Sequence, residues 1–350
     1  GVYTIYKFKR LSLSFSEVLS WHAVILCSLV GLILGNKRLK FRPRLRIMDV
    51  SESSGVVLNM LLFIFYPVYL LFTIREFQFL RDKGYFLTYT GEYEESLTAK
   101  LVGYVILVLF AIAFSRLKLS RVRFILLSTA YVLPNFVISI NGPRGDFVLS
   151  LVLVIWLAHK RGLYFSRKYL ALFALSLVPI TYLILVNRYV VSDFYILMQI
   201  LLMEIGNSSL IIPYSNYVGL PGFWDTPMLM APFQLNPFQG QSLSYLDHTW
   251  GLGHHLTAAL SRVSYLNGEG IGSSFIAELN QIGLIAVFLG SALLGAVIRV
   301  LDDYYSRSYI VRIYSFILVP HIVFIPRTSF FPPAIVVIIF TVIFLLYFTL

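Results

Sequence analysis

The chain has 350 residues, of which 58% are hydrophobic, 16% aromatic and only 13% charged. Soluble globular domains carry roughly 25% charged residues, so this composition excludes an ordinary soluble protein. The apolar residues come in unbroken blocks rather than in alternation, which excludes a transmembrane β-barrel and predicts an all-α, polytopic membrane protein. The formal net charge of +11 must be compared with membrane topology before a polyanionic partner is considered.

Nine apolar blocks approach the roughly 20 residues that a membrane-spanning helix requires. A further apolar stretch, 194–212, contains Glu204, and we expect it to lie in the membrane interface because an unpaired carboxylate at mid-bilayer is costly. The sequence therefore predicts about 9–11 transmembrane helices. Because the chain starts at Gly1, we also expect that a terminal segment, such as one more N-terminal span, precedes it. The blocks are 18–35, 54–74, 101–115, 122–140, 147–158, 169–187, 274–298, 309–325 and 331–350.

The connections after the first, third, fifth and seventh blocks are rich in lysine and arginine. By the positive-inside rule we expect all four to face the cytoplasm. They hold most of the 28 basic residues, so the net charge is mainly a topology signal and nucleic acid is not an expected partner. Lys7, Lys9 and Arg10 do not fit this scheme. The basic residues of the four connections are Lys37, Arg38, Lys40, Arg42, Arg44, Arg46, Arg116, Lys118, Arg121, Arg123, Lys160, Arg161, Arg167, Lys168, Arg299, Arg307 and Arg312.

The same alternation places the long connection 188–273 on the outer side. Its frequent proline and glycine residues predict a folded lid made of short pieces. We therefore expect three regions: N-terminal transmembrane helices in 1–187, a periplasmic loop with short helices in 188–273, and C-terminal transmembrane helices in 274–350. The single cysteine, Cys27, permits no internal disulfide and no cysteine metal cluster.

Four arginines are expected on the outer side, each next to the end of a predicted span or in the lid: Arg144, Arg188, Arg262 and Arg327. A guanidinium group offers a fixed fork of donors that suits phosphate oxygens. The set therefore predicts a site for a phosphorylated or pyrophosphorylated headgroup. The alternative is that each arginine snorkels to the interface or forms a local ion pair.

Candidate acids and bases gather in the window 247–278. A histidine there can act as a general base near neutral pH, whereas a polar loop residue bonded to the backbone is the structural alternative. No metal site is predicted, because no spacing such as HExxH is present. Glu278 opens the seventh block, where a carboxylate either stabilises the helix start or acts as a base. The candidates, left unranked, are His255, His254, His248, Asp247 and Glu278.

Three segments resemble Wzy-type O-antigen (oligosaccharide repeat unit) polymerases: Arg-Gly-Asp-Phe at 144–147, the stretch Gly268–Gly283, and Pro-Arg-Thr-Ser at 326–329. The resemblance implies a multi-pass enzyme of the bacterial inner membrane whose active site faces the periplasm. It implies inverting transfer of a growing glycan from undecaprenyl pyrophosphate to the non-reducing end of a lipid-linked repeat unit, without metal, nucleotide or other cofactor. Lipid-linked repeat units, membrane lipid and a polysaccharide chain-length regulator are the partners that it implies.

Other functions are compatible with parts of this pattern. An O-antigen ligase would transfer the glycan to lipid A core and differs in its acceptor. A flippase of lipid-linked sugars would need cations along a path through the bilayer, whereas the predicted spans contain few ionisable residues, such as His22 and His321. A structural scaffold in a polysaccharide assembly would tolerate substitution of the four outer arginines.

Overall fold

The computed structural model describes residues 15–38, 54–84, 96–116, 119–142, 144–163, 193, 195, 211–215, 218–219, 224–234, 241–268 and 270–349. Within these ranges the chain is helical and contains no strand, which confirms the all-α prediction. The helices are α2 (Phe15–Arg38), α3 (Ser54–Lys83), α4 (Leu97–Ser115), α5 (Arg121–Ser139), α6 (Arg144–Lys160), η2 (Met228–Phe233), α9 (Leu243–Leu246), α10 (Leu252–Leu260), α11 (Arg262–Leu266), α12 (Phe275–Asn280), α13 (Leu284–Tyr304), α14 (Tyr309–Phe324), η3 (Ile325–Arg327) and α15 (Ala334–Thr349).

Six described helices are long and apolar enough to cross a membrane: α2, α3, α4, α5, α13 and α14. The C-terminal helix α15 is apolar but shorter, and α6 has 17 residues. The prediction of a polytopic membrane protein is therefore confirmed. The predicted span 169–187 and most of the stretch 194–212 lie outside the described residues, so a total of 9–11 helices stays a prediction.

The predicted seventh span, 274–298, is two helices in the structure. The short helix α12 ends at Asn280, and α13 begins at Leu284 after a break at Gly283. Gly283 has a φ of 129°, which L side chains rarely adopt, so a helix cannot run through this position. Glu278 therefore lies in a separate helix before the span and not in the first turns of the span itself.

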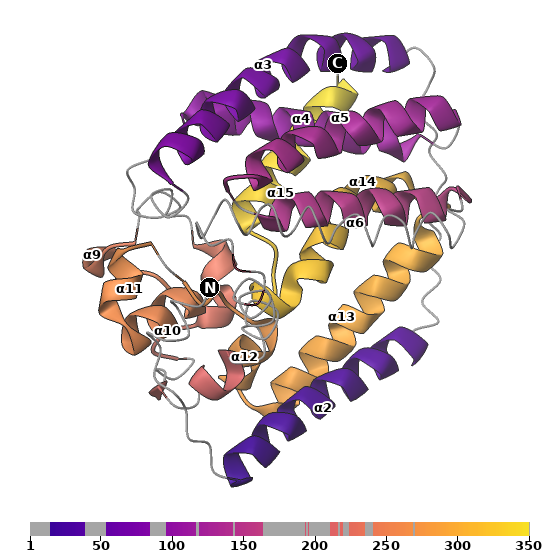
Figure 1. Cartoon of the computed structure of the whole chain (residues 1–350). Helices are drawn as coiled ribbons and strands as arrows, with labels where there is room; N and C mark the ends of the chain where they lie inside the picture. Colours follow the sequence, from indigo (N-terminus) through magenta and orange to yellow (C-terminus); the bar gives the residue numbers. More distant parts are fainter. Residues whose placement is uncertain are drawn as a thin grey trace.

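Helices α2 and α13 run parallel and pack closely. Glycines at the contact allow the two backbones to approach: a Cβ atom on Gly35 would lie 1.9 Å from the carbonyl oxygen of Ala292. The hydroxyl groups of Ser28 and Ser291 are 2.8 Å apart across the same contact. Small residues spaced four apart are a known solution for tight helix pairs in membranes. The pair lies along one side of the molecule in Figure 1.

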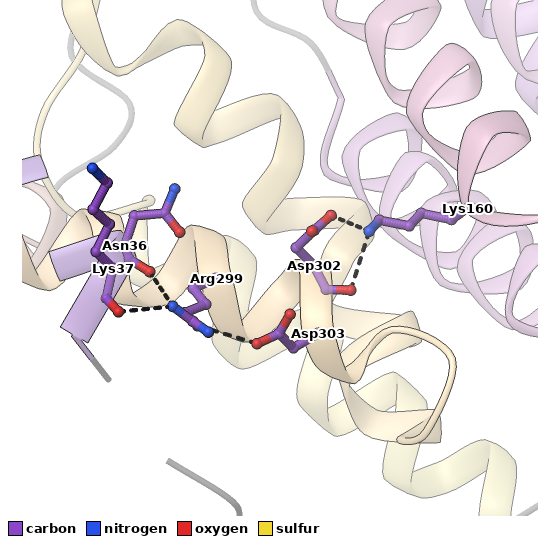
Figure 2. Close-up of polar contacts among 6 residues, drawn as sticks. All are labelled: Asn36, Lys37, Lys160, Arg299, Asp302 and Asp303. Carbon is purple, nitrogen blue, oxygen red and sulfur yellow. Dashed lines mark hydrogen bonds and ion pairs between the residues drawn. The ribbon is translucent and has the colours of Figure 1, made fainter. Parts of the chain in front are cut away.

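The C-terminal ends of α2 and α13 are joined by Arg299. Its Nη1 atom donates hydrogen bonds to the carbonyl oxygens of Asn36 (2.6 Å) and Lys37 (3.0 Å), and its Nε atom pairs with Asp303 at 3.2 Å (Figure 2). The last carbonyl groups of a helix lack partners within the helix and carry partial negative charge. Arg299 of α13 thus provides hydrogen-bond donors for the last carbonyl groups of α2.

Other cations at this end act in the same way. Lys160, the last residue of α6, donates to the carbonyl oxygen of Asp302 at 3.1 Å and pairs with its carboxylate (Figure 2). Arg161 donates to the carbonyl oxygens of Phe114 and Arg116, where α4 ends. The C-terminal ends of α2, α4, α6 and α13, after which the basic connections of the sequence begin, therefore lie at one end of the bundle, in agreement with the predicted charge alternation.

The opposite end of the bundle holds the short helices. Figure 1 shows α9 to α12 grouped on the left, while the C-terminal ends of α2, α6 and α13 lie on the right. The short helices share an apolar cluster in which Leu252, Leu256 and Ile271 are buried, and Trp21 of α2 packs against it. A larger aromatic core centred on Phe114 of α4 holds the remaining long helices together.

Candidate functional site

The three sequence segments singled out above come together at the end of the bundle that holds the short helices. A Cβ atom on Gly145, at the start of α6, would lie 3.6 Å from the ring of Phe324, which precedes η3. A Cβ atom on Gly272 would lie 3.5 Å from the carbonyl oxygen of Arg327. The amide of Phe330 donates a 3.0 Å hydrogen bond to Glu278. Segments that lie far apart in the chain, such as those around Gly145 and Phe324, are therefore neighbours in the fold.

Glu278 is fully buried at the centre of this arrangement. One carboxylate oxygen accepts a 2.6 Å hydrogen bond from Ser273, the other accepts the bond from Phe330, and the Ser329 side chain also contacts the carboxylate. Burial raises the pKa of the Glu278 carboxyl above its ordinary value, and these hydrogen bonds partly oppose the shift. A carboxylate whose two oxygens both bind neighbouring loops is well placed to hold those loops together.

The side chain of His321 reaches the same turn. Its Nε2 atom lies 3.1 Å from the carbonyl oxygen of Phe330, and because a carbonyl only accepts, the imidazole is the donor. His321 was not among the site residues predicted from the sequence. The available signal was its position: an ionisable residue inside a membrane span is a functional candidate by default.

His254 lies in the first turn of α10 between two tyrosine rings. The ring centroids of Tyr245 and Tyr265 are 5.1 Å and 5.9 Å from that of the imidazole, both edge-on, and the Tyr265 hydroxyl is 3.4 Å from Nδ1. Burial, together with the neighbouring His255, lowers the pKa of His254 from 6.5 to about 4. The ring is therefore neutral at neutral pH.

His255 has a defined orientation. Its Nε2 atom is 2.6 Å from the carbonyl oxygen of Thr249, so Nε2 carries the proton of the neutral ring. Nδ1 is then the unprotonated nitrogen, the form that a general base needs. A Cβ atom on Gly253 would lie 2.8 Å from the carbonyl oxygen of Gly272, so the start of α10 abuts the loop that contacts Arg327.

Two further candidate bases, Asp247 and His248, lie between α9 and α10 and are exposed. The main-chain carbonyl of His248 accepts a hydrogen bond from Gln234, but neither side chain bonds to another residue in the described part of the chain. Among the described residues, no three histidine, cysteine, aspartate or glutamate side chains are grouped in a way that could hold a metal ion.

The four predicted arginines differ in their placement. Arg327 ends η3 and is partly exposed, with no ion pair to any residue in the described ranges. Arg144 is the first residue of α6, directly before Gly145, so its backbone lies near the same turn; its side chain is outside the described part. Arg262 begins α11 on the exposed surface of the short helices, and Arg188 lies outside the described residues.

The family model of the O-antigen polysaccharide polymerase Wzy matches residues 2–350, essentially the whole chain. The chain belongs to this family. The resemblance seen in the three segments is thus confirmed over the full length, and the protein is an O-antigen polymerase, a glycosyltransferase-type enzyme that acts on lipid-linked oligosaccharide repeat units. No curated protein and no solved structure matches the chain.

In this O-antigen polymerase, the candidate residues fall into two groups. Glu278, Arg327 and the start of α6 with Arg144 are brought together around one turn, and Gly253, directly before His254 and His255, abuts the adjoining loop. A further set, Asp247, His248 and Arg262, lies exposed on the short helices.

Proposed function

We propose that the enzyme transfers a growing glycan from undecaprenyl pyrophosphate to the non-reducing end of an incoming lipid-linked repeat unit, by inverting glycosyl transfer. The observation that supports this most is the convergence of the three family-like segments opposite the four basic connections. The positive-inside rule assigns the basic end to the cytoplasm. The proposed site then faces the periplasm of a bacterial inner membrane.

The proposed role of the arginines is to bind pyrophosphate. As the glycosidic bond breaks, its electron pair passes to the pyrophosphate oxygen, and the enzyme must stabilise that charge. Arg327 is partly exposed three residues before Phe330, whose amide binds the buried Glu278, and Arg144 begins the helix that meets Phe324 at Gly145. A guanidinium group can bind two phosphate oxygens at once. Arg188 and Arg262 remain proposed ligands further along the same headgroup.

His255 is the candidate that we favour as general base. The acceptor hydroxyl attacks the anomeric carbon, the bond to pyrophosphate breaks, and the hydroxyl proton passes to Nδ1 of His255. A single in-line displacement inverts the anomeric configuration. Thr249 holds the ring in the required tautomer, whereas the low pKa of His254 makes it a weaker base. Glu278 already accepts hydrogen bonds on both oxygens, and Asp247 and His248 lie exposed between α9 and α10.

The test uses purified protein in nanodiscs with undecaprenyl-pyrophosphate-linked repeat units as the sole substrate and EDTA present. We expect a ladder of lengthening lipid-linked glycans. Arg327→Ala and His255→Ala should each slow it by about 10²-fold or more, the range of one electrostatic or acid–base contribution. Arg307→Ala, an exposed arginine at the basic end, is the control and should leave the ladder unchanged.

Other outcomes would replace the proposal. Transfer that requires lipid A core would make the protein a ligase, and movement of the lipid-linked unit across the membrane without elongation would make it a flippase. A ladder that survives both active-site substitutions would refute the residue assignment. Adding a chain-length regulator to the assay should narrow the distribution of glycan lengths if it is a partner.

A further inference from the structure

We infer that Glu278 and His321 are positioning residues that hold the backbone of Phe330 from two sides and thereby fix the turn that carries Arg327. This inference rests on the proposed function only for the role of Arg327. The two hydrogen bonds that hold Phe330 do not depend on the proposed function. His321 was not expected to belong to the site.

The backbone amide and the backbone carbonyl of Phe330 both form hydrogen bonds with side chains. The amide of Phe330 donates to Glu278 at 3.0 Å, and the carbonyl of Phe330 accepts from His321 at 3.1 Å. Glu278 belongs to α12 and His321 to the last turn of α14. The segment between η3 and α15 is therefore tied both to α14, which runs directly into η3, and to α12, where Glu278 lies 52 residues before Phe330.

Glu278 is itself held in place. Ser273 donates to it at 2.6 Å and the Ser329 side chain also contacts it. A buried carboxylate is costly unless its oxygens accept hydrogen bonds, so this set of donors allows a charged or polar group to remain in a fully buried position. The carboxylate links the loop before α12 to the turn after η3.

The ring of Phe330 adds an apolar contact to the same hold. Its centroid lies 6.4 Å from that of Phe275, the first residue of α12, and 4.9 Å from that of Phe331. Phe331 in turn packs edge-on against Phe233 of η2 at 5.2 Å. The backbone and the ring of Phe330 are thus both anchored to the segments that surround the site.

The consequence for Arg327 follows from its distance along the chain. Arg327 stands three residues before Phe330, and its carbonyl oxygen lies against Gly272 in the loop that leads to Glu278. If Phe330 is released, the turn loses its hydrogen bonds to Glu278 and His321, and the guanidinium of Arg327 moves relative to the loop. A misplacement of about 1 Å at a reacting centre can lower the rate by about 10²-fold.

The experiment compares truncating and conservative substitutions at both positions. Glu278→Gln keeps an oxygen that accepts from Phe330 and removes the charge, and His321→Gln keeps a donor near the Nε2 position. Glu278→Ala and His321→Ala remove the hydrogen bonds. His22→Ala is the matched control, because His22 bonds only to Val18 O within its own helix among the described residues.

Two measurements are made on each variant. Hydrogen–deuterium exchange of the peptide that contains Phe330 reports the hold without reference to activity, and elongation of lipid-linked repeat units reports catalysis. We expect both alanine variants to exchange at least about tenfold faster at this peptide and to elongate about 10²-fold more slowly. Both glutamine variants should stay within a few-fold of the intact protein in both measurements, as should His22→Ala.

The outcomes separate the two ideas. Unchanged exchange in His321→Ala or Glu278→Ala would refute the hold. A Glu278→Gln variant with native exchange but the low activity of Glu278→Ala would make Glu278 a general base or an essential charge and overturn its positioning role. If the intact protein elongates nothing, the proposed function fails, and the exchange comparison still decides whether the two residues hold the turn. If one alanine variant does not fold, the other still decides, because His321→Ala and Glu278→Ala each remove a different hydrogen bond to Phe330.

Discussion

Replacing Gly35 by alanine tests the close packing of α2 against α13. A Cβ atom at this position would lie 1.9 Å from the carbonyl oxygen of Ala292. Non-bonded heavy atoms pack at roughly 3.5–4.0 Å, so α2 would have to move outward by roughly 1.5–2 Å. Gly103 in α4 offers a matched control, because a Cβ atom there would meet nothing within 4 Å.

The two substitutions should change stability in opposite directions. Alanine is favoured over glycine inside a helix by about 0.5–1 kcal/mol, so Gly103→Ala should be neutral or raise the free energy of unfolding by up to that amount. At Gly35 the same gain is opposed by overpacking, which costs about 1–3 kcal/mol or more. A net loss of about 1–2 kcal/mol is expected for Gly35→Ala.

The measurement is thermal unfolding of the detergent-solubilised protein followed by tryptophan fluorescence. The melting temperature should rank Gly103→Ala at or above the intact protein and Gly35→Ala below it. Glycan elongation should also fall in Gly35→Ala, because Trp21 and Val24 of α2 pack against the short helices near Glu278. A Gly35→Ala protein as stable as Gly103→Ala would show that the backbones are not in contact and would refute the reasoning.

Three further predictions use the same unfolding assay. Arg299→Ala should lower the free energy of unfolding by about 1 kcal/mol, because it removes two hydrogen bonds to the end of α2, whereas Arg307→Ala should change little. The folded-state pKa of His254 is about 4, below its ordinary 6.5, so the unfolded state binds more protons between these values. Stability should be full above about pH 6.5 and decrease as the pH falls towards 4, with a smaller decrease in His254→Gln; equal slopes would contradict this. Gly283→Ala should cost about 1–3 kcal/mol because its φ of 129° is strained for any L side chain, and a cost near zero would argue against that backbone conformation.

Much of the membrane architecture follows from the sequence. The predicted spans 54–74, 101–115 and 122–140 correspond to α3, α4 and α5, because a long apolar stretch in lipid has to form a helix that satisfies its own backbone. The clustering of basic residues on alternate connections also agrees with the structure. Lys160 contacts α13 and Arg299 contacts α2 at the same end of the bundle. The predicted start of the seventh span was wrong, because hydropathy does not reveal the positive φ of Gly283.

The candidate site was predicted in part. Arg327, Glu278, His254 and His255 were named from residue type and position, and the structure brings the segments that contain them together. The sequence suggested that Glu278 is a helix cap or a base, and it did not indicate that this residue links two loops. His321 was missed because a single histidine in an apolar helix has no pattern around it.

The sequence by itself determined that this protein is helical and membrane-embedded, and its charges predict an orientation, since hydropathy and charge are properties of each segment taken alone. The tertiary structure decided which segments touch. The parallel approach of α2 and α13, the cations that satisfy the helix ends of their neighbours, and the hydrogen bond from Phe330 to Glu278 all join residues far apart in the chain. Such contacts depend on how packed helices bring particular backbone groups within hydrogen-bonding distance, which no local pattern specifies.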